Sequence, residues 1–141
     1  MIRTATREDI PRMVEMGRRF RNESTYNKYL ADNPAKMAEL GAKLIENDGI
    51  VVLERDGEIT GMLGFVIHEH FISGERVAGE IFWWVSPEHR GDGLRLLREV
   101  ERRARNAGAK YLHMIAPSER VKTLYERLKF DFVESTYQRS L

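Results

Sequence analysis

The sequence predicts an α/β (α+β) fold with a mixed central sheet and helices on both of its faces. The first observation is a β-α-β pattern: an apolar run at Val77–Val85, an amphipathic stretch ending at Gly108, and a second apolar run at Tyr111–Ala116. Such a crossover makes its two strands parallel. The second observation is the turn signal Asp56-Gly57 between two strand-like segments, which are therefore antiparallel. Both kinds of pairing in one sheet make it mixed.

Composition narrows the class of protein. The chain has 141 residues, 42% hydrophobic and 32% charged, which fits one domain over residues 1–141 with a proper core. A net charge of +1 gives no general attraction to nucleic acid or to an anionic membrane, so neither is expected as a partner. The absence of cysteine excludes disulfides, thiolate metal sites and an acyl-cysteine intermediate. The N-terminus lacks the apolar core of a signal peptide, and the cytoplasm is the expected location.

The N-terminal third is expected to contain a short strand and two helices. Ile2–Ala5 is the strand, and Thr6 or Asp9 caps the first helix. The polar and aromatic segment Asn22–Asp32 is expected to be a loop. Its Tyr26 and Tyr29 either line an acceptor pocket or simply pack. Asn33-Pro34 opens the second helix, because Asn is a good N-cap and Pro is tolerated at the first helical position; Asn47-Asp48-Gly49 ends it.

A hairpin follows, with strands at Ile50–Arg55 and Glu58–Phe71. Gly61 and Gly64 inside the second strand predict a bulge or a close approach of another group to the backbone. His68 and His70 have the spacing of a metal pair on one face. The spacing offers no third ligand, so no metal site is expected.

The run Val77–Val85 is expected to be a central strand covered on both sides, because it is apolar on both faces. Simple alternation puts Glu80 on the face of Ala78, Phe82 and Trp84. Burial there raises the pKa of a carboxyl group and makes Glu80 a candidate general base. The alternative is a structural carboxylate paired with an arginine.

The joint after this strand carries a second candidate site. Pro87 ends the strand, and Arg90-Gly91-Asp92-Gly93 leads into an amphipathic helix. The first N–H groups of a helix have no intrahelical partner, glycines let an anion approach the backbone, and arginine offers a fork for phosphate oxygens. These features predict a pyrophosphate cradle formed by the residues from Arg90 through Leu94 to Arg95; the alternative is a structural turn.

Two elements are expected after the β-α-β unit. Pro117-Ser118 precedes a helix whose inward stripe includes Leu124 and Tyr125. The alternating segment Phe132–Arg139 is expected to be a further strand that closes the sheet.

Two stretches of the chain carry a family resemblance. Val85–Leu94, VSPEHRGDGL, resembles motif A of the GNAT superfamily of acyl-CoA-dependent N-acyltransferases, Arg/Gln-x-x-Gly-x-Gly/Ala: Arg90 and Gly93 match it, whereas Arg95 stands where a small residue is usual. Ser118–Phe130 resembles the family's Asn-x-x-Ala-x-x-Leu-Tyr-Glu-Lys-x-Gly-Phe, with Ser118 in place of Asn and Lys129 in place of Gly. The order of the elements extends the resemblance over essentially the whole chain. The stretch WWVSPEHRGDGLRLL is also similar to phage- and prophage-encoded members of the superfamily.

The resemblance implies a GNAT fold and direct N-acetyl transfer from acetyl-CoA, as cosubstrate, to a primary amine of a small molecule or protein. It implies that the pantetheine arm runs along the strand at Val85 and that the pyrophosphate meets the Arg90–Arg95 amides. Ser118 is a further position expected at the cofactor, with Glu80 as base and Tyr125 as the acid for the leaving thiolate. A homodimer is compatible with it. Two alternatives are a non-catalytic acyl-CoA-binding module and an interaction protein that docks on a host target.

Overall fold

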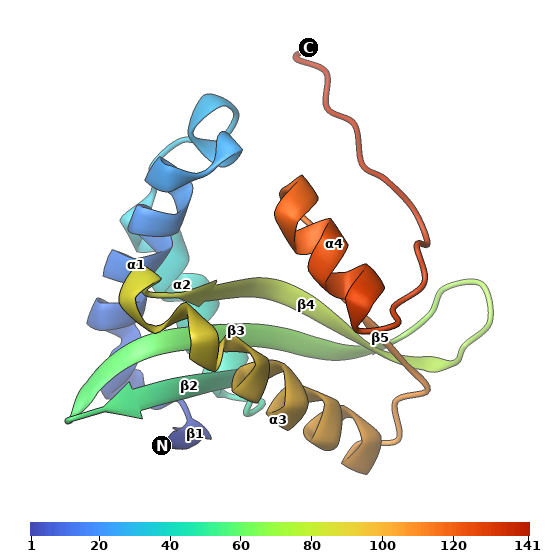
Figure 1. The fold of residues 1–141 in the computed structure, drawn as a ribbon, viewed down its shortest axis with the longest axis horizontal. Helices are drawn as coiled ribbons and strands as arrows, with labels where there is room; N and C mark the ends of the chain where they lie inside the picture. Colours follow the sequence, from blue (N-terminus) through green and yellow to red (C-terminus); the bar gives the residue numbers. More distant parts are fainter.

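The structure is a computed structural model that describes residues 1–141, and its centre is a five-stranded sheet in the order β1-β2-β3-β4-β5 (Figure 1). The first four strands pair antiparallel and β4 pairs parallel with β5. The predicted mixed sheet is therefore confirmed. The strands are β1 (Ile2–Thr4), β2 (Ile50–Arg55), β3 (Glu58–Glu69), β4 (Arg76–Val85) and β5 (Tyr111–His113).

Helices cover both faces of the sheet, as the sequence predicts. α1 (Ile10–Glu23) and α2 (Pro34–Ile45) lie on one face, where Met16, Ile50 and Trp84 belong to one buried cluster. α3 (Gly93–Asn106) lies on the other face, where its Leu96 and Val100 pack with strand residues in a second cluster (Figure 1). The remaining helices are the 3₁₀ turns η1 (Arg7–Asp9), η2 (Thr25–Lys28) and η3 (Pro87–Asp92), and α4 (Glu119–Arg127).

The two parallel strands are paired over only three residues. Val77, Ala78 and Gly79 of β4 pair with β5, whereas β3 accompanies β4 along its whole length. From Glu80 to Val85 the edge of β4 that faces away from β3 therefore has no neighbouring strand. Main-chain groups on that edge are available to a ligand.

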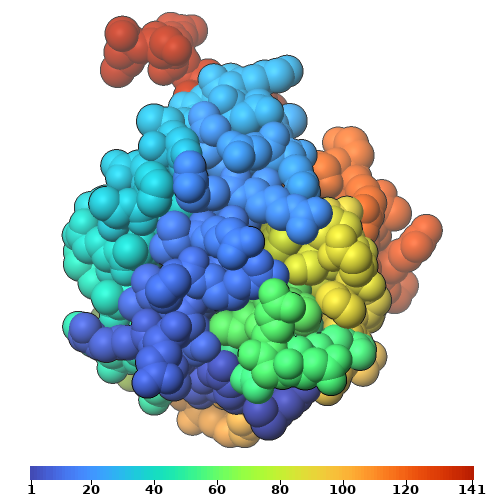
Figure 2. Space-filling view, turned by 90° about the vertical axis from the view of Figure 1, so that its left-hand side faces the viewer, coloured from blue at the N-terminus to red at the C-terminus, as the bar shows by residue number.

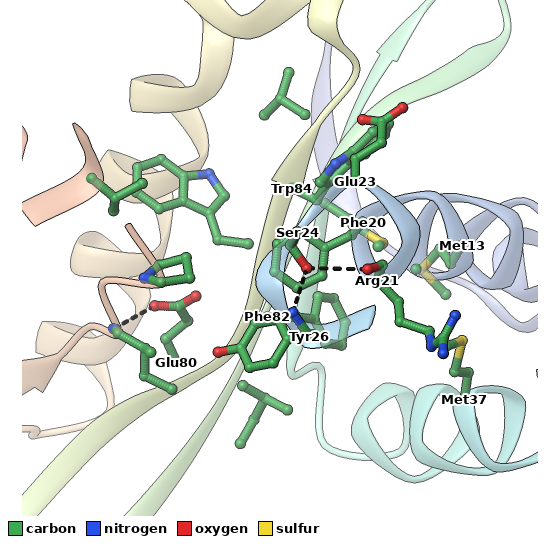
Figure 3. Close-up of a pocket in the computed structure, with 18 of the residues that line it drawn as sticks. Met13, Phe20, Arg21, Glu23, Ser24, Tyr26, Met37, Glu80, Phe82 and Trp84 are labelled. Carbon is green, nitrogen blue, oxygen red and sulfur yellow. Dashed lines mark hydrogen bonds between the residues drawn. The ribbon is translucent and has the colours of Figure 1, made fainter. Parts of the chain in front are cut away.

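A β-bulge in β4 places Glu80 on the face opposite to the one that simple alternation predicts. Gly64 pairs with Phe82 but Phe65 pairs with Glu80, so Ile81 is an extra residue in the ladder. The shift turns Glu80 away from Phe82 and Trp84, and Figure 3 shows Glu80 and Phe82 on opposite sides of the strand. Strict alternation fails here because a side-chain period of two holds only while the ladder is regular.

The glycines of β3 lie where the register is irregular. A Cβ atom at Gly64 would lie 2.5 Å from Cζ of Phe82, so only glycine leaves room for that ring. The register also shifts on the other side of β3, near Gly61. The predicted bulge and close approach are both confirmed.

Several segments differ from expectation. β3 ends at Glu69 rather than Phe71. β5 ends at His113 rather than Ala116, and the Asn22–Asp32 segment contains η2. The predicted strand Phe132–Arg139 is wrong: these residues form no strand, are exposed, and lead away from the sheet in Figure 1. Alternation alone cannot indicate whether a sheet edge is within reach, and after α4 the chain turns through Lys129, at φ 65°, away from β5.

Candidate active site

A cavity of about 780 Å³ lies beside the open edge of β4 and extends to both sides of the strand. One side is lined from α4 and the segment after β5, and includes Glu80, Tyr125 and Ile115. The other is lined from α1, η2 and α2, and includes Phe20 and Tyr26 (Figure 3). The volume of the whole cavity is within the range of about 300–1,000 Å³ that is typical of small-molecule sites.

Glu80 is a largely buried carboxyl group without a cationic partner. Its Oε2 accepts a hydrogen bond of 2.7 Å from the backbone N–H of Ile115, and it takes part in no ion pair. Burial raises the pKa of Glu80 to about 7, against the opposing effects of the Ile115 N–H and of Tyr125. The alternative of a carboxylate held by arginine is therefore excluded, and near pH 7 this group both accepts and releases a proton.

Tyr125 comes from the inward side of α4 and is buried. Its hydroxyl donates a 3.0 Å hydrogen bond to the backbone carbonyl of Ile115, and its ring lies 6.2 Å from that of Trp83 in a stacked arrangement. Burial raises the pKa of Tyr125 above its usual range, and the neighbouring Glu80 adds to this effect. The phenol thus keeps its proton at neutral pH.

The peptide groups of Ile115 join the two candidate residues, because its N–H binds Glu80 and its C=O binds Tyr125. This also accounts for the early end of β5, since these main-chain groups bind side chains instead of continuing a ladder. No pattern in the sequence indicates this role of Ile115. Its contribution is made by the backbone alone, which leaves no signal in the residue type.

The open edge of β4 presents the backbone of Val85. Ser86 N–H donates to the carbonyl of Thr60 in β3 at 2.8 Å. Since successive residues of a strand point their main-chain groups in opposite directions, those of Val85 and Trp83 face the open edge. The indole Nε1 of Trp83 is buried without a hydrogen-bond partner, a second unused donor near this edge.

The segment that leads into α3 combines an unpaired cation with bare backbone. Arg90 is exposed and makes no ion pair, and a Cβ atom at Gly91 would have no other atom within 4 Å. Gly93 differs from expectation: it is buried, its N–H donates to the carbonyl of Arg90, and a Cβ atom there would contact Trp83 and Val85 at 3.5 Å. Gly93 therefore serves helix–strand packing, whereas Gly91 leaves space for a ligand.

Asp92 is held by an ion-pair partner that no spacing in the sequence indicates. Arg55 of β2 pairs with its carboxylate at 2.6 Å and holds the pKa of Asp92 below its usual range. Arg95 lies 3.8 Å from the same carboxylate, and Leu94 is half-buried beside it in α3. Arg55 offsets the negative charge of Asp92 where an anion would approach, and no sequence spacing connects the two residues.

The remaining candidates lie around the cavity or outside it. Ser118 lines the cavity and caps α4, because its Oγ accepts from Val121 N–H at 3.3 Å. Tyr26 lines the cavity as well, whereas Tyr29 is exposed and does not. His68 belongs to no group of three or more side chains able to hold a metal. None of the helices has both the length and the apolar character needed to cross a membrane.

Comparison with solved structures gives proteins of the same fold. A transcriptional regulator from Bacillus halodurans C-125 matches with a TM-score of 0.80 and 20% identity, over 100% of this chain and 99% of that one. A ribosomal-protein-alanine N-acetyltransferase from Brucella melitensis biovar Abortus 2308 matches at 0.72 and 18%, over 100% and 99%. An aminoglycoside N-acetyltransferase in complex with CoA matches at 0.78 and 15%, over 100% and 93%.

A search among curated proteins found no match to the sequence. The model of the acetyltransferase (GNAT) family, by contrast, matches residues 14–130, which include β4, the start of α3 and Tyr125. The match thus covers both stretches on which the resemblance rests, and it agrees with the mixed sheet and its open parallel pair. The chain belongs to the GNAT family of acetyltransferases.

Proposed function

We propose that the protein transfers an acetyl group from acetyl-CoA directly to a primary amine, with Glu80 as general base and Tyr125 as general acid. The observation that carries the proposal is their meeting on Ile115 at the open edge of β4. A non-catalytic acyl-CoA-binding module would have no need of a buried carboxyl group with a pKa of about 7 beside a buried phenol.

The residues around the cavity fit acetyl-CoA. The unpaired main-chain groups of Val85 and Trp83 would hold the amide-bearing pantetheine arm as an added strand would be held. Arg90 and the open backbone at Gly91 would hold the pyrophosphate at the start of α3. Ser118, whose hydroxyl proton is free, would supply a further hydrogen bond. When bound, this cosubstrate supplies the thioester carbon that the amine attacks.

Glu80 would remove the proton that prevents the amine from reacting. An alkylammonium of pKa about 10 costs about 4 kcal/mol to neutralise at pH 7, so a base matched to neutral pH favours attack. The nitrogen then forms a bond to the thioester carbon and the carbon–sulfur bond breaks. A backbone N–H of β4 would stabilise the charge on the carbonyl oxygen; the bulged Ile81 is the candidate, because a bulge leaves its extra residue unpaired.

Tyr125 would give its proton to the departing thiolate. Its pKa is raised partly by the charge of Glu80, so protonation of Glu80 by the amine makes the phenol a stronger acid when the thiolate forms. Glu80 would pass the ammonium proton to solvent and accept the second proton that nitrogen loses as the amide forms. Return of that second proton to the phenolate of Tyr125, which binds the same residue, Ile115, would restore both groups. The products are the acetamide and CoA thiol: of the two protons that nitrogen loses, one goes to solvent and the other replaces the proton that Tyr125 gives to sulfur.

The test is acetyl-CoA turnover with a panel of primary amines, with CoA thiol release and the mass of the acetylated product measured together. We expect stoichiometric thiol and acetamide with at least one amine. CoA binding without thiol release for any amine would contradict the proposal and leave a binding module.

A further inference from the structure

The part of the cavity on the α1 side of β4 is lined by side chains that would favour some amines over others. Here we call it the apolar lobe, and Figure 3 shows its lining side chains on the α1 side of β4: Met13, Phe20, Tyr26, Met37, Phe82 and Trp84. Phe20 and Tyr26 place their ring centroids 5.5 Å apart. In Figure 2, α1, η2 and α2 form a continuous outer wall, bordered by the yellow residues at the end of β4 and in η3.

The lobe has no carboxylate free to meet a cation. Its charged lining residues are Arg21 and Glu23. Glu23 pairs with Arg19 at 2.7 Å, and the guanidinium of Arg21 donates to the carbonyl of Leu30 at 2.7 Å. Elsewhere in the cavity the charged side chains are Glu80, Arg90 and Arg120, so basic groups outnumber acidic ones. Glu80 is thus the one carboxyl group in the cavity without a cationic partner.

This charge pattern opposes a polycationic acceptor. Each ammonium group buried without a counter-charge costs free energy, and a polyamine or aminosugar carries several. An amine with a single ammonium group and an apolar body has only one charge to bury. It also gains free energy, because its apolar body leaves water and contacts aromatic and Met side chains. Both sides belong to one cavity, and Ile81 of β4, which is 39% exposed, also lines it. One molecule can therefore occupy the lobe and reach Glu80.

We infer that the acceptor is a monoamine of the arylalkylamine class, with its ring in the apolar lobe and its primary amine at the open edge of β4 beside Glu80. The inference rests on the proposed acetyl transfer and adds the class of acceptor. The tyrosine hydroxyl of Tyr26 points into the cavity and offers a polar contact to a ring substituent (Figure 3). The acetyl step itself is the one described above, with the same bonds formed and broken.

The experiment compares kcat/KM for four acceptors with the wild-type protein and saturating acetyl-CoA: 2-phenylethylamine, ethylamine, kanamycin and a peptide with an N-terminal alanine. Phenylethylamine and ethylamine differ only in the ring. The ring should raise kcat/KM by at least about 100-fold, the scale on which apolar pockets discriminate, and kanamycin should be no better than ethylamine. A higher kcat/KM for kanamycin or for the peptide would overturn the inference while leaving acetyl transfer intact. Acetylation of none of the four, with turnover of another amine of the wider panel, would overturn the inference alone; no turnover with any amine of that panel would overturn the proposed function as well.

A variant pair adds a direct test of the lobe. Met37→Glu puts a free carboxylate into the lobe from α2 and should lower kcat/KM for phenylethylamine about tenfold or more, while KM for acetyl-CoA stays unchanged. The control is Lys36→Glu on the same helix, which does not line the cavity and should leave both parameters unchanged. Equal effects of the two variants on phenylethylamine would contradict the assignment. If Met37→Glu does not fold, the comparison of phenylethylamine with ethylamine still decides.

Discussion

The ionisation of Glu80 and that of Tyr125 are linked, because the charge of Glu80 adds to the effect of burial in raising the pKa of Tyr125. Both side chains also bind the same residue of the backbone. Ile115 donates to the carboxylate at 2.7 Å and accepts from the phenol at 3.0 Å. Burial raises both pKa values, that of Glu80 to about 7. A carboxyl group that changes charge near neutral pH beside a phenol that stays protonated is an arrangement suited to moving one proton in and one proton out.

Tyr125→Phe separates the acid from the packing role. The ring keeps its contacts with Trp83 and Phe130, so only the hydrogen bond to Ile115 is lost and stability should fall by about 1 kcal/mol. Turnover should fall about 10- to 1,000-fold with KM for acetyl-CoA near normal, because leaving-group protonation is lost. Steady-state kinetics and a thermal melt measure both effects. Unchanged turnover would assign Tyr125 to the core alone.

Because the pKa of Glu80 is raised by folding, the free energy of unfolding should depend on pH. Its pKa rises from 4.5 to about 7 on folding, so between these values the unfolded chain loses this proton more readily than the folded one. The free energy of unfolding should therefore fall as pH rises from about 4.5 to 7, by up to about 3 kcal/mol, and then level off.

Urea unfolding of wild type and Glu80→Gln at pH 5 and pH 8 measures this effect as a difference. The variant cannot ionise, so its stability relative to wild type should improve toward pH 8. Glu119→Gln, at an exposed carboxylate, is the matched control and should follow wild type. Parallel pH profiles for Glu80→Gln and wild type would contradict the raised pKa.

Among single residues, the sequence allowed Glu80, Arg90 and Tyr125 to be proposed, because a carboxylate in an apolar strand and a family motif are visible in residue types. The partners of Glu80, Tyr125 and Asp92 could not be proposed from the sequence. Ile115 acts through its backbone, and Arg55 meets Asp92 across 37 positions of sequence. Contacts of both kinds depend on tertiary structure, which residue spacing does not encode.

At the scale of elements, β4 and the start of α3 together supply most of the candidate site. The bulge at Ile81 turns Glu80 toward α4 while leaving Phe82 and Trp84 on the α1 side, so a single strand serves both sides of the cavity. The glycines of β3 predicted an irregularity but not its direction. Which face Glu80 occupies depended on one extra residue in the ladder, and a hydrophobic pattern with apolar residues on both faces could not reveal it.

The two glycines at the start of α3 should respond differently to substitution. Gly91→Val adds a side chain in open space and should weaken CoA binding without changing the melting temperature. Gly93→Val adds atoms against Trp83 and Val85 and should lower the melting temperature by overpacking. Calorimetric titration with CoA and thermal melts measure these effects. A Gly91→Val protein with wild-type affinity would exclude the pyrophosphate from this segment.

Arg90→Ala tests the cation of the same segment. It should weaken CoA binding by about 1.5–3 kcal/mol, the range for hydrogen bonds to charged groups. Arg98→Ala, at an exposed arginine eight residues after Arg90 in α3, is the control and should bind CoA normally. Equal losses in the two variants would indicate general attraction rather than a phosphate contact.

At the scale of the molecule, the sheet holds two helices on one face and α3 on the other, and parts its two parallel strands after three paired residues. The sequence predicted the order of these elements because each has a clear period and clear end signals. Residue patterns do not indicate over how many residues two strands pair. For this reason the length of β5 and the absence of a strand at Phe132–Arg139 were not predicted. The early separation of β4 from β5 is nevertheless what creates the cavity and brings Ile115 to Glu80.

The most direct test of acetyl transfer through Glu80 is the pH dependence of kcat/KM for wild type and Glu80→Gln with the best amine acceptor. In wild type, kcat/KM should rise with pH through an apparent pKa of about 7, the value that burial gives this carboxyl group. In Glu80→Gln it should be about 10²–10⁴-fold lower at pH 7, and should rise only at the higher pH where the amine itself loses its proton. Superimposable profiles of equal rate would contradict the role of Glu80, and would leave desolvation in the cavity as the means by which the amine becomes reactive.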